Sequence, residues 1–287
     1  MLMTGQAVLA PAHEHGFAVP AFNVSDHAML KGLVEISEEL HSPLIVAIHP
    51  DELAHVGVDF IPSVIARAHR THVPVAIHLD HGATLDQVLS AIQAGFTSVM
   101  IDGSLLPFDE NLALTKEVTR VAHAVGVSVE GELGTIGKLD EQAEAGASEI
   151  VHTDPADALR FVTETGVDSL AIAIGTSHGL YPAGMTPELR LDLLDEIKKT
   201  VEVPLVLHGG SGNPDDEIAQ AASRGIGKIN ISSDIKAAYH QAMREALIAD
   251  PSLREPNVIQ PLSIPAMKKV AADKIRLFGA DGKADLY

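Results

Sequence analysis

The chain lacks cysteine and tryptophan, and only 3% of its residues are aromatic. Without cysteine, neither a disulfide framework nor a thiolate metal site can form. So few aromatic side chains leave little surface on which nucleic-acid bases could stack. No apolar run reaches the roughly 18 residues that a membrane-spanning helix needs. These absences argue against a membrane partner and against a base-binding protein.

Positive charge is also scarce. The chain has 20 lysine and arginine residues against 39 aspartate and glutamate residues, a formal net charge of −19. Nucleic acid is therefore not expected as a partner, because binding a phosphate backbone needs a basic patch. Any anionic substrate would have to be held by local backbone donors against a repulsive overall field.

The first residues, MLMTGQAVLAPAHEHG, have no basic leader before their short apolar stretch, so a signal peptide is not expected. Together with the absence of cysteine, this favours a cytoplasmic location.

The main pattern present is an alternation of short apolar, β-branched runs with amphipathic stretches. Near-continuous apolar strands that alternate with helices indicate a parallel sheet covered on both faces. Eight strands in about 215 residues with no break favour a closed (β/α)₈ TIM barrel, which we expect to form a single domain over residues 1–287. The runs lie at 18–23, 43–49, 74–81, 98–102, 127–134, 168–175, 203–210 and 227–232.

Helix-start signals separate these runs. Ser25-Asp26, Asp154-Pro155 and Thr186-Pro187 each precede a helix-like stretch, and proline is favoured at the first helical position.

Nearly every run ends on a residue able to do chemistry. In barrels of this kind the active site is built at the carboxyl ends of the strands. Polarity simply resumes at many strand ends, but this set is rich in metal ligands and carboxylates, which favours an active site. The residues are Asn23, His49, Asp80, His81, Asp102, Glu132, His208 and Asn230, with His178 a few residues after the sixth run.

Three of these histidines suggest a metal site. His81, His178 and His208 follow strands that a closed barrel brings to one rim, and three imidazoles with an open fourth position are typical of catalytic zinc. Asp80, next to His81, could serve the metal or transfer a proton. Two further carboxylates, Asp102 and Glu132, could hold a second metal ion, orient a ligand histidine or make plain structural hydrogen bonds. His78 is expected to point inward rather than to bind metal.

Two glycine- and serine-rich segments follow the last two runs. HGGSG at 208–212 offers unobstructed backbone N–H groups, and NISSD at 230–234 leads directly into a helix. Barrel enzymes often bind phosphate in these two loops, against a helix N-terminus. Backbone dipoles could thus hold an anion without lysine.

The segments HLDHG, MIDGS, EGELG, AIGTSHGLY, VPLVLHGGSG and GKINISSD together resemble the class II, zinc-dependent ketose-bisphosphate aldolases. The resemblance runs from about residue 5 to KIRLFGADGKA and is closer to the branch of tagatose-bisphosphate and bacterial fructose-bisphosphate aldolases. It implies cleavage of a tagatose- or fructose-type ketose 1,6-bisphosphate to dihydroxyacetone phosphate and glyceraldehyde 3-phosphate, through a metal-stabilised enediolate. It also implies one catalytic Zn²⁺, a possible second divalent or monovalent ion, and a homo-oligomer (dimer or tetramer).

The resemblance assigns roles to individual residues. It implies that His81, His178 and His208 bind zinc, that Asp80 is the catalytic acid/base, and that Asp102 and Glu132 form a second metal position. A loop carboxylate, Asp140 or less closely Glu141, matches the base of a mobile loop. The implied contacts to dihydroxyacetone phosphate are Asn23, Gly179, Gly209, Gly210, Ser211, Asn230, Ile231, Ser232 and Ser233.

Two departures concern the far end of the substrate. His49 stands where relatives usually have a small hydroxyl residue, and Glu255-Pro256-Asn257 replaces their Asp-Pro-Arg, with Arg254 close by. A ketose 1-phosphate without the distal phosphate is therefore an alternative substrate.

Three other functions remain to be weighed. A Schiff-base aldolase would need a lysine at a strand's carboxyl end, whereas Lys228 begins the last run and is expected on the opposite rim. A zinc hydrolase could use the same histidines, but the phosphate-type loops argue against it. A non-catalytic sugar-phosphate-binding subunit would be expected to lack a ligand or the acid/base.

Overall fold

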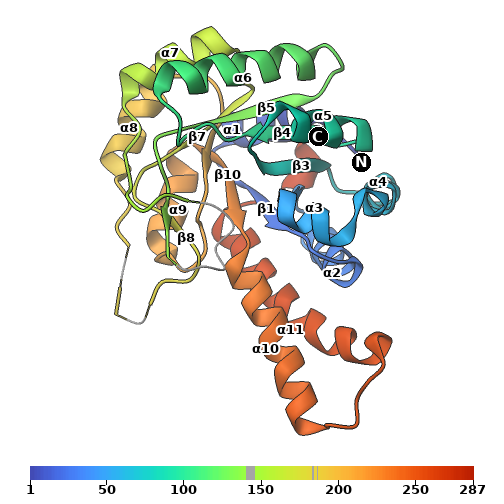
Figure 1. The fold of residues 1–287 in the computed structure, drawn as a ribbon. Helices are drawn as coiled ribbons and strands as arrows, with labels where there is room; N and C mark the ends of the chain where they lie inside the picture. The colour runs from blue at the N-terminus through green and yellow to red at the C-terminus, as the bar shows by residue number, and fades with distance from the viewer. Residues whose placement is uncertain (140–145, 183, 186) are drawn as a thin grey trace.

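Eight parallel strands close into a barrel at the centre of the molecule, as the (β/α)₈ prediction requires (Figure 1). The computed structural model describes residues 1–139, 146–182, 184–185 and 187–287. Around the barrel the strand order is β1-β10-β9-β7-β5-β4-β3-β2. The strands are β1 (Val19–Asn23), β2 (Leu44–Ile48), β3 (Val75–Gly82), β4 (Ser98–Ile101), β5 (Ser128–Leu133), β7 (Ser169–Ile172), β9 (Leu205–Leu207) and β10 (Ile226–Ile231). Each lies within one of the apolar runs or, for β3 and β10, extends one residue beyond it.

Helices cover the outside of the barrel, so the strands are buried on both faces and need no polar side. Helix α1 (Gly5–His15) packs against several strands near the end where they begin. The remaining helices are α2 (His27–Glu39), α3 (Pro50–Val56), α4 (Ile61–Arg70), α5 (Leu85–Ala94), α6 (Phe108–His123), α7 (Pro155–Thr165), α8 (Leu191–Thr200), α9 (Asp215–Arg224), α10 (Ser233–Ala249) and α11 (Pro256–Leu277). Short 3₁₀ turns form at Val58–Phe60 and Lys283–Leu286.

Helix boundaries follow local capping chemistry. Asp26 accepts a hydrogen bond from the N–H of Met29, and Asp154 accepts from Ala156 and Asp157, so two of the predicted helix starts are confirmed. The third prediction, at Thr186-Pro187, is wrong because α8 begins at Leu191.

The segment before α8 is held in a non-helical conformation by bonds to other parts of the fold. The N–H of Arg190 donates to the carbonyl of Ile174, and the N–H of Leu189 donates to the Glu217 carboxylate. Thr186 itself lies outside the described residues.

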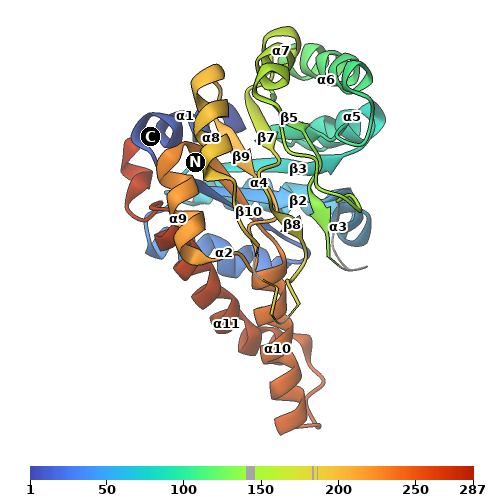
Figure 2. The same ribbon diagram turned by 90° about the vertical axis from the view of Figure 1, so that its left-hand side faces the viewer.

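Helices α10 and α11 pack against each other and extend beyond the barrel as an arm (Figures 1 and 2). The turn between them, residues 250–255, forms the tip of this arm. In the described part of the chain, no helix has the length and apolar character needed to cross a bilayer.

Candidate metal centre and substrate pocket

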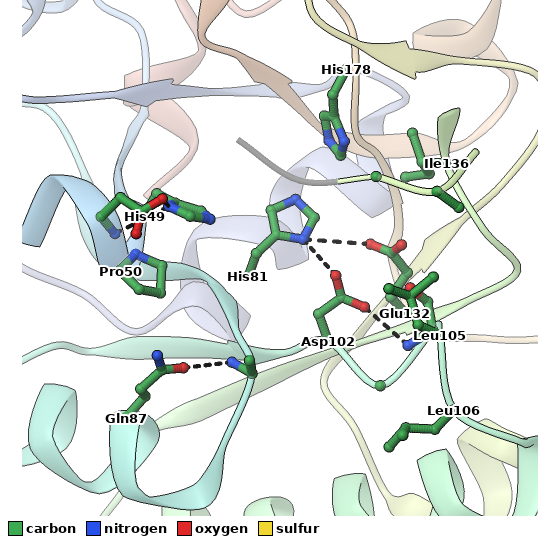
Figure 3. Close-up of a pocket in the computed structure, with 16 residues that line it drawn as sticks. His49, Pro50, His81, Gln87, Asp102, Leu105, Leu106, Glu132, Ile136 and His178 are labelled. Carbon is green, nitrogen blue, oxygen red and sulfur yellow. Dashed lines mark hydrogen bonds and ion pairs between the residues drawn. The ribbon is translucent and has the colours of Figure 1, made fainter. Parts of the chain in front are cut away.

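The polar residues that end the strands meet at one mouth of the barrel, and β3 provides two of them, Asp80 and His81. Of this set, Figure 3 shows His49, His81, Asp102, Glu132 and His178. The pairing of β3 with β4 shifts register between Leu79 and Gly82, which marks a β-bulge at Asp80 and His81. His81 has a φ of 50°, in the left-handed region that is unusual for a residue with a side chain. This strained turn brings both consecutive side chains to the site, where a regular strand would aim them to opposite faces.

His81, His178 and His208 come together at this mouth. The ring centroid of His81 lies 5.0 Å from that of His178 and 4.6 Å from that of His208. One ring nitrogen of each histidine lies within 4.8 Å of the other two, a spacing that can hold a metal ion. His178 lies on a short strand, β8 (Ser177–His178), that pairs with β6 (Gly137–Lys138).

Carboxylates orient two of the three rings. The Nδ1–H of His81 donates to Asp102 Oδ2 at 2.9 Å, and the Nε2–H of His208 donates to Glu130 Oε1 at 2.7 Å. The opposite nitrogens, His81 Nε2 and His208 Nδ1, are buried and have no hydrogen-bond partner among the described residues. Histidine ligands typically bind metal through one nitrogen while a carboxylate holds the other. These residues therefore fit a metal ion.

The charges around the histidines also favour a cation. Burial lowers the pKa of His81, but the Asp80 charge and the hydrogen bond to Asp102 outweigh it and raise the pKa to about 10. Burial, with the neighbouring His81 charge, lowers the pKa of His208 and so favours its neutral, ligating form.

Asp80 is fixed by two amides. The side-chain nitrogens of Asn23 and Asn230 each donate to one of its carboxylate oxygens at 2.9 Å. Its Oδ1 lies 3.9 Å from both His81 Nε2 and His208 Nδ1. Burial raises the Asp80 pKa, but the neighbouring positive charges of His81 and Lys228 hold it well below its usual range. A group reaching the metal position would thus meet an ionised carboxylate.

Asp102 and Glu132 both lie next to the His81 ring (Figure 3). Asp102 is in hydrogen-bond contact with His81, whereas Glu132 Oε2 is 4.0 Å from His81 Nδ1. Burial and the nearby Asp102 charge raise the Glu132 pKa well above its usual range. The three residues form a second group able to hold a metal ion, which would compete with the Asp102–His81 hydrogen bond.

A small pocket beside the histidines contains most of the residues predicted to contact dihydroxyacetone phosphate. Helix α10 begins at its wall, so the positive end of the helix dipole faces the pocket. Gly209 has a φ of 63°, and an added Cβ would lie 2.7 Å from the Ser177 carbonyl oxygen, so only glycine fits. Of the predicted contacts, Gly210 and Ile231 do not line this pocket. The lining residues are Asn23, Asp80, His178, Gly179, Gly209, Ser211, Asn230, Ser232 and Ser233.

A larger pocket of about 480 Å³ is lined by His81 and His178 together with Asp102 and Glu132 (Figure 3). Its wall includes His49, Gln87, Ser104 and the exposed Leu105. His49 caps α3, because its Nδ1 accepts from the N–H of Asp51 at 3.2 Å. Within the described residues, no lysine or arginine lines this pocket.

Other predicted residues lie elsewhere. Asp140 and Glu141 fall outside the described residues. Arg254 is exposed at the tip of the arm, where it pairs with Glu255, and Asn257 lies in the first turn of α11. Neither lines the two pockets at the barrel mouth.

Lys228 is not on the opposite rim, so that prediction is wrong. Its side chain is buried inside the barrel and donates to both Glu130 oxygens, at 3.0 and 2.8 Å. An ammonium group paired in this way lines neither pocket and is unsuited to attack a carbonyl carbon, which further weakens the Schiff-base alternative.

Sequence reasoning missed Glu130 and Glu52. Glu130 precedes Glu132 by two residues, and this spacing places both on one face of a strand, a signal that could have found it. Glu52 accepts from the backbone N–H of His49 at 2.8 Å and from Ser25 Oγ at 2.9 Å, and its carboxylate lies 2.6 Å from Lys236 Nζ. The run His49-Pro50-Asp51-Glu52 has the form of a helix start with a capping box, which could have indicated this role.

A parallel barrel with a histidine cluster able to hold a metal ion and a glycine- and serine-rich pocket at the carboxyl ends of its strands is typical of barrel enzymes. The sequence profile of the family described as "Fructose-bisphosphate aldolase class-II" matches residues 3–283. The chain therefore belongs to the class II fructose-bisphosphate aldolase family, and it is an aldolase, a carbon–carbon lyase.

Solved structures agree with this assignment. The YdjI aldolase from Escherichia coli K12 is 35% identical, with a TM-score of 0.88 over 99% of this chain and 100% of that one. A putative fructose-1,6-bisphosphate aldolase from Coccidioides immitis is 28% identical, with a TM-score of 0.88 over 99% and 98% of the two chains. A fructose-bisphosphate aldolase from Campylobacter jejuni, at 23% identity, shares the fold with a TM-score of 0.82 over 98% and 96%.

Proposed function

We propose that this protein is a zinc-dependent aldolase that reversibly cleaves a tagatose- or fructose-type ketose 1,6-bisphosphate to dihydroxyacetone phosphate and glyceraldehyde 3-phosphate. The observation that carries the proposal is the convergence of His81, His178 and His208 on one point, with the Asp80 carboxylate beside it and the glycine–serine pocket adjoining. Three imidazole ligands with room for substrate suit Zn²⁺ better than the harder cations.

When bound, the zinc ion supplies Lewis-acid polarisation of the ketose carbonyl. The protein contributes the proton transfer. Asp80, ionised and held by Asn23 and Asn230, takes the proton of the C4 hydroxyl during cleavage and returns it during condensation. Its fixed position spares the reaction the cost of orienting the base.

The dihydroxyacetone phosphate half is anchored by backbone groups. The loop of Gly209 and Ser211 lines the pocket together with Ser232, the N-cap residue of α10, and Ser233, its first residue. Their N–H groups and hydroxyls bind the phosphate. Gly179, Gly210 and Ile231 complete the proposed binding set. This arrangement explains how a chain with a net charge of −19 can hold an anion.

Two further roles rest on the family. Asp140, with Glu141 as the alternative, is proposed as the loop base that exchanges a proton with the dihydroxyacetone phosphate carbon. Asp102 and Glu132 are proposed as a second metal position.

We further propose that the protein is a cytoplasmic homo-oligomer, a dimer or a tetramer. Each chain is proposed to form a single domain over residues 1–287. Light scattering coupled to gel filtration tests the oligomeric state.

A second substrate is favoured by the composition of the larger pocket. Its described wall has no lysine or arginine. Polar side chains such as His49, Gln87 and Ser104 can hydrogen-bond to hydroxyl groups, and the described wall lacks the lysine or arginine that would favour a second phosphate. The same chemistry on a ketose 1-phosphate that lacks the distal phosphate is therefore the alternative.

A substrate panel separates the two. Release of dihydroxyacetone phosphate is measured from fructose and tagatose 1,6-bisphosphates and from the matching 1-phosphates. A higher kcat/KM for a bisphosphate supports the main proposal. A higher kcat/KM for the 1-phosphates would leave the proposed mechanism unchanged and would identify a ketose 1-phosphate as the substrate. Release from none of these sugars contradicts both.

A further inference from the structure

A chain of buried polar side chains runs through the barrel interior to the metal site. The interior of such barrels is ordinarily filled by branched apolar side chains. Here Lys228, Glu130 and His78 occupy it, and Lys228 and Glu130 are only 1% and 2% exposed. Burying such a pair rarely stabilises a fold relative to apolar residues of similar volume. A role beyond packing therefore needs to be considered.

Each hydrogen-bond donor in this row of buried side chains faces an acceptor. Lys228 Nζ donates to Glu130 Oε1 and Oε2, and its third proton faces His78 Nε2 at 3.4 Å. The Nδ1–H of His78 in turn donates to Ser98 Oγ at 2.8 Å. Burial and the Lys228 charge lower the pKa of His78 to about 3, so this ring stays neutral and accepts. The Lys228 ammonium is thus held from three sides.

The same Glu130 oxygen that binds Lys228 also accepts from His208 Nε2 at 2.7 Å. Because a carboxylate can only accept, the proton of His208 must lie on Nε2, and Nδ1 is left with its lone pair facing the metal position. Without the ammonium, the Glu130 carboxylate would have His208 as its remaining partner and could rotate away from this alignment.

We propose that Lys228 is a positioning residue for the metal site: it clamps both oxygens of Glu130 so that Oε1 holds His208 with Nδ1 directed at the metal. The inference rests on the proposed metal site, but its test reads metal binding and does not require aldol cleavage. A result against the role of Lys228 can therefore be told apart from a result against the proposed substrate.

The experiment measures Zn²⁺ affinity, by competition with a chromophoric chelator, and the visible absorption spectrum of Co²⁺ bound in place of zinc. In the double variant K228M/E130Q both charges are removed together, and the glutamine oxygen can still accept from His208. We expect Zn²⁺ binding to weaken about 10- to 100-fold, as for other residues that orient ligands, and the Co²⁺ bands to shift. The control K198M removes a lysine outside the barrel that faces His13, and should change neither reading.

A second variant tests the position of the Glu130 carboxylate without changing its charge. It can be measured even if the double variant does not fold. Glu130→Asp keeps both charges but withdraws the carboxylate by one methylene, so it should also weaken Zn²⁺ binding and shift the Co²⁺ bands. The proposal would be overturned if either folded variant, K228M/E130Q or Glu130→Asp, bound Zn²⁺ with wild-type affinity and gave the wild-type Co²⁺ spectrum.

Discussion

Asp80 Oδ1 lies 3.9 Å from Nε2 of His81, its own neighbour in the sequence. In a regular strand these two side chains would point to opposite faces. The bulge in β3 and the positive φ of His81 remove that restriction, so one strand end contributes both a candidate base and a candidate ligand. Strain of this kind persists where the surrounding structure holds it, here through Asn23, Asn230 and Asp102.

Removing the Asp80 carboxylate should stop proton transfer without emptying the metal site. For Asp80→Ala we expect kcat to fall by about 10²- to 10⁴-fold, the usual contribution of a positioned acid/base. Zinc content should remain that of the wild type, because His81, His178 and His208 are unchanged. Steady-state kinetics and metal analysis of the same sample check this. The control Asp86→Ala removes an exposed carboxylate from α5, and a kcat for Asp80→Ala equal to that of the control would refute the role.

Adding a methyl group at Gly209 should damage phosphate binding. A side chain at φ 63° costs roughly 1–2 kcal/mol, and here the new Cβ would lie 2.7 Å from the Ser177 carbonyl oxygen. The loop must shift, and we expect KM to rise by at least about tenfold, which corresponds to 1.4 kcal/mol of binding.

Gly16→Ala is the matched control for this variant. Gly16 has a φ of 68° but no heavy atom within 4 Å of an added Cβ. It should lower the Tm and leave KM unchanged. An unchanged KM in Gly209→Ala would argue against the assignment of this pocket to phosphate.

The cap of α7 predicts a purely structural effect. Asp154 accepts from the N–H groups of Ala156 and Asp157, so Asp154→Ala should cost about 1 kcal/mol of unfolding free energy. In a chain of this size that lowers the Tm by about 2–4 °C. Thermal denaturation measures the change, Asp154→Asn should restore most of it, and kcat/KM should stay the same in both. A Tm unchanged by the alanine would show that the cap does not stabilise the helix.

The positions of the strands could be predicted from the sequence because each is buried on both faces and appears as an unbroken apolar run. The location of the candidate active site at one mouth of the barrel could be predicted from the polar residues that end the runs, because parallel strands have their carboxyl ends at the same rim. His81, His178 and His208 are far apart in sequence, yet the barrel topology alone brings them to one rim.

What the sequence could not provide is the content of the barrel interior. Lys228 stands at the start of the last run, a position that predicts the opposite rim, whereas its side chain is buried inside the barrel. Its partner Glu130 comes from a strand about 100 residues earlier, and only the closed barrel brings the two within 2.8 Å. The start of α8 was misplaced for a similar reason, since bonds to Ile174 and Glu217 override the local helix signal.

We expect aldol cleavage by this protein to depend on a single metal ion held by His81, His178 and His208. The most direct measurement is the cleavage rate of chelator-treated protein as Zn²⁺ is added back, alongside the amount of zinc bound per chain. We predict no activity in the metal-free protein, recovery that saturates at one zinc ion per chain, and no recovery in His208→Ala. Full cleavage activity in protein shown to contain no metal would contradict it.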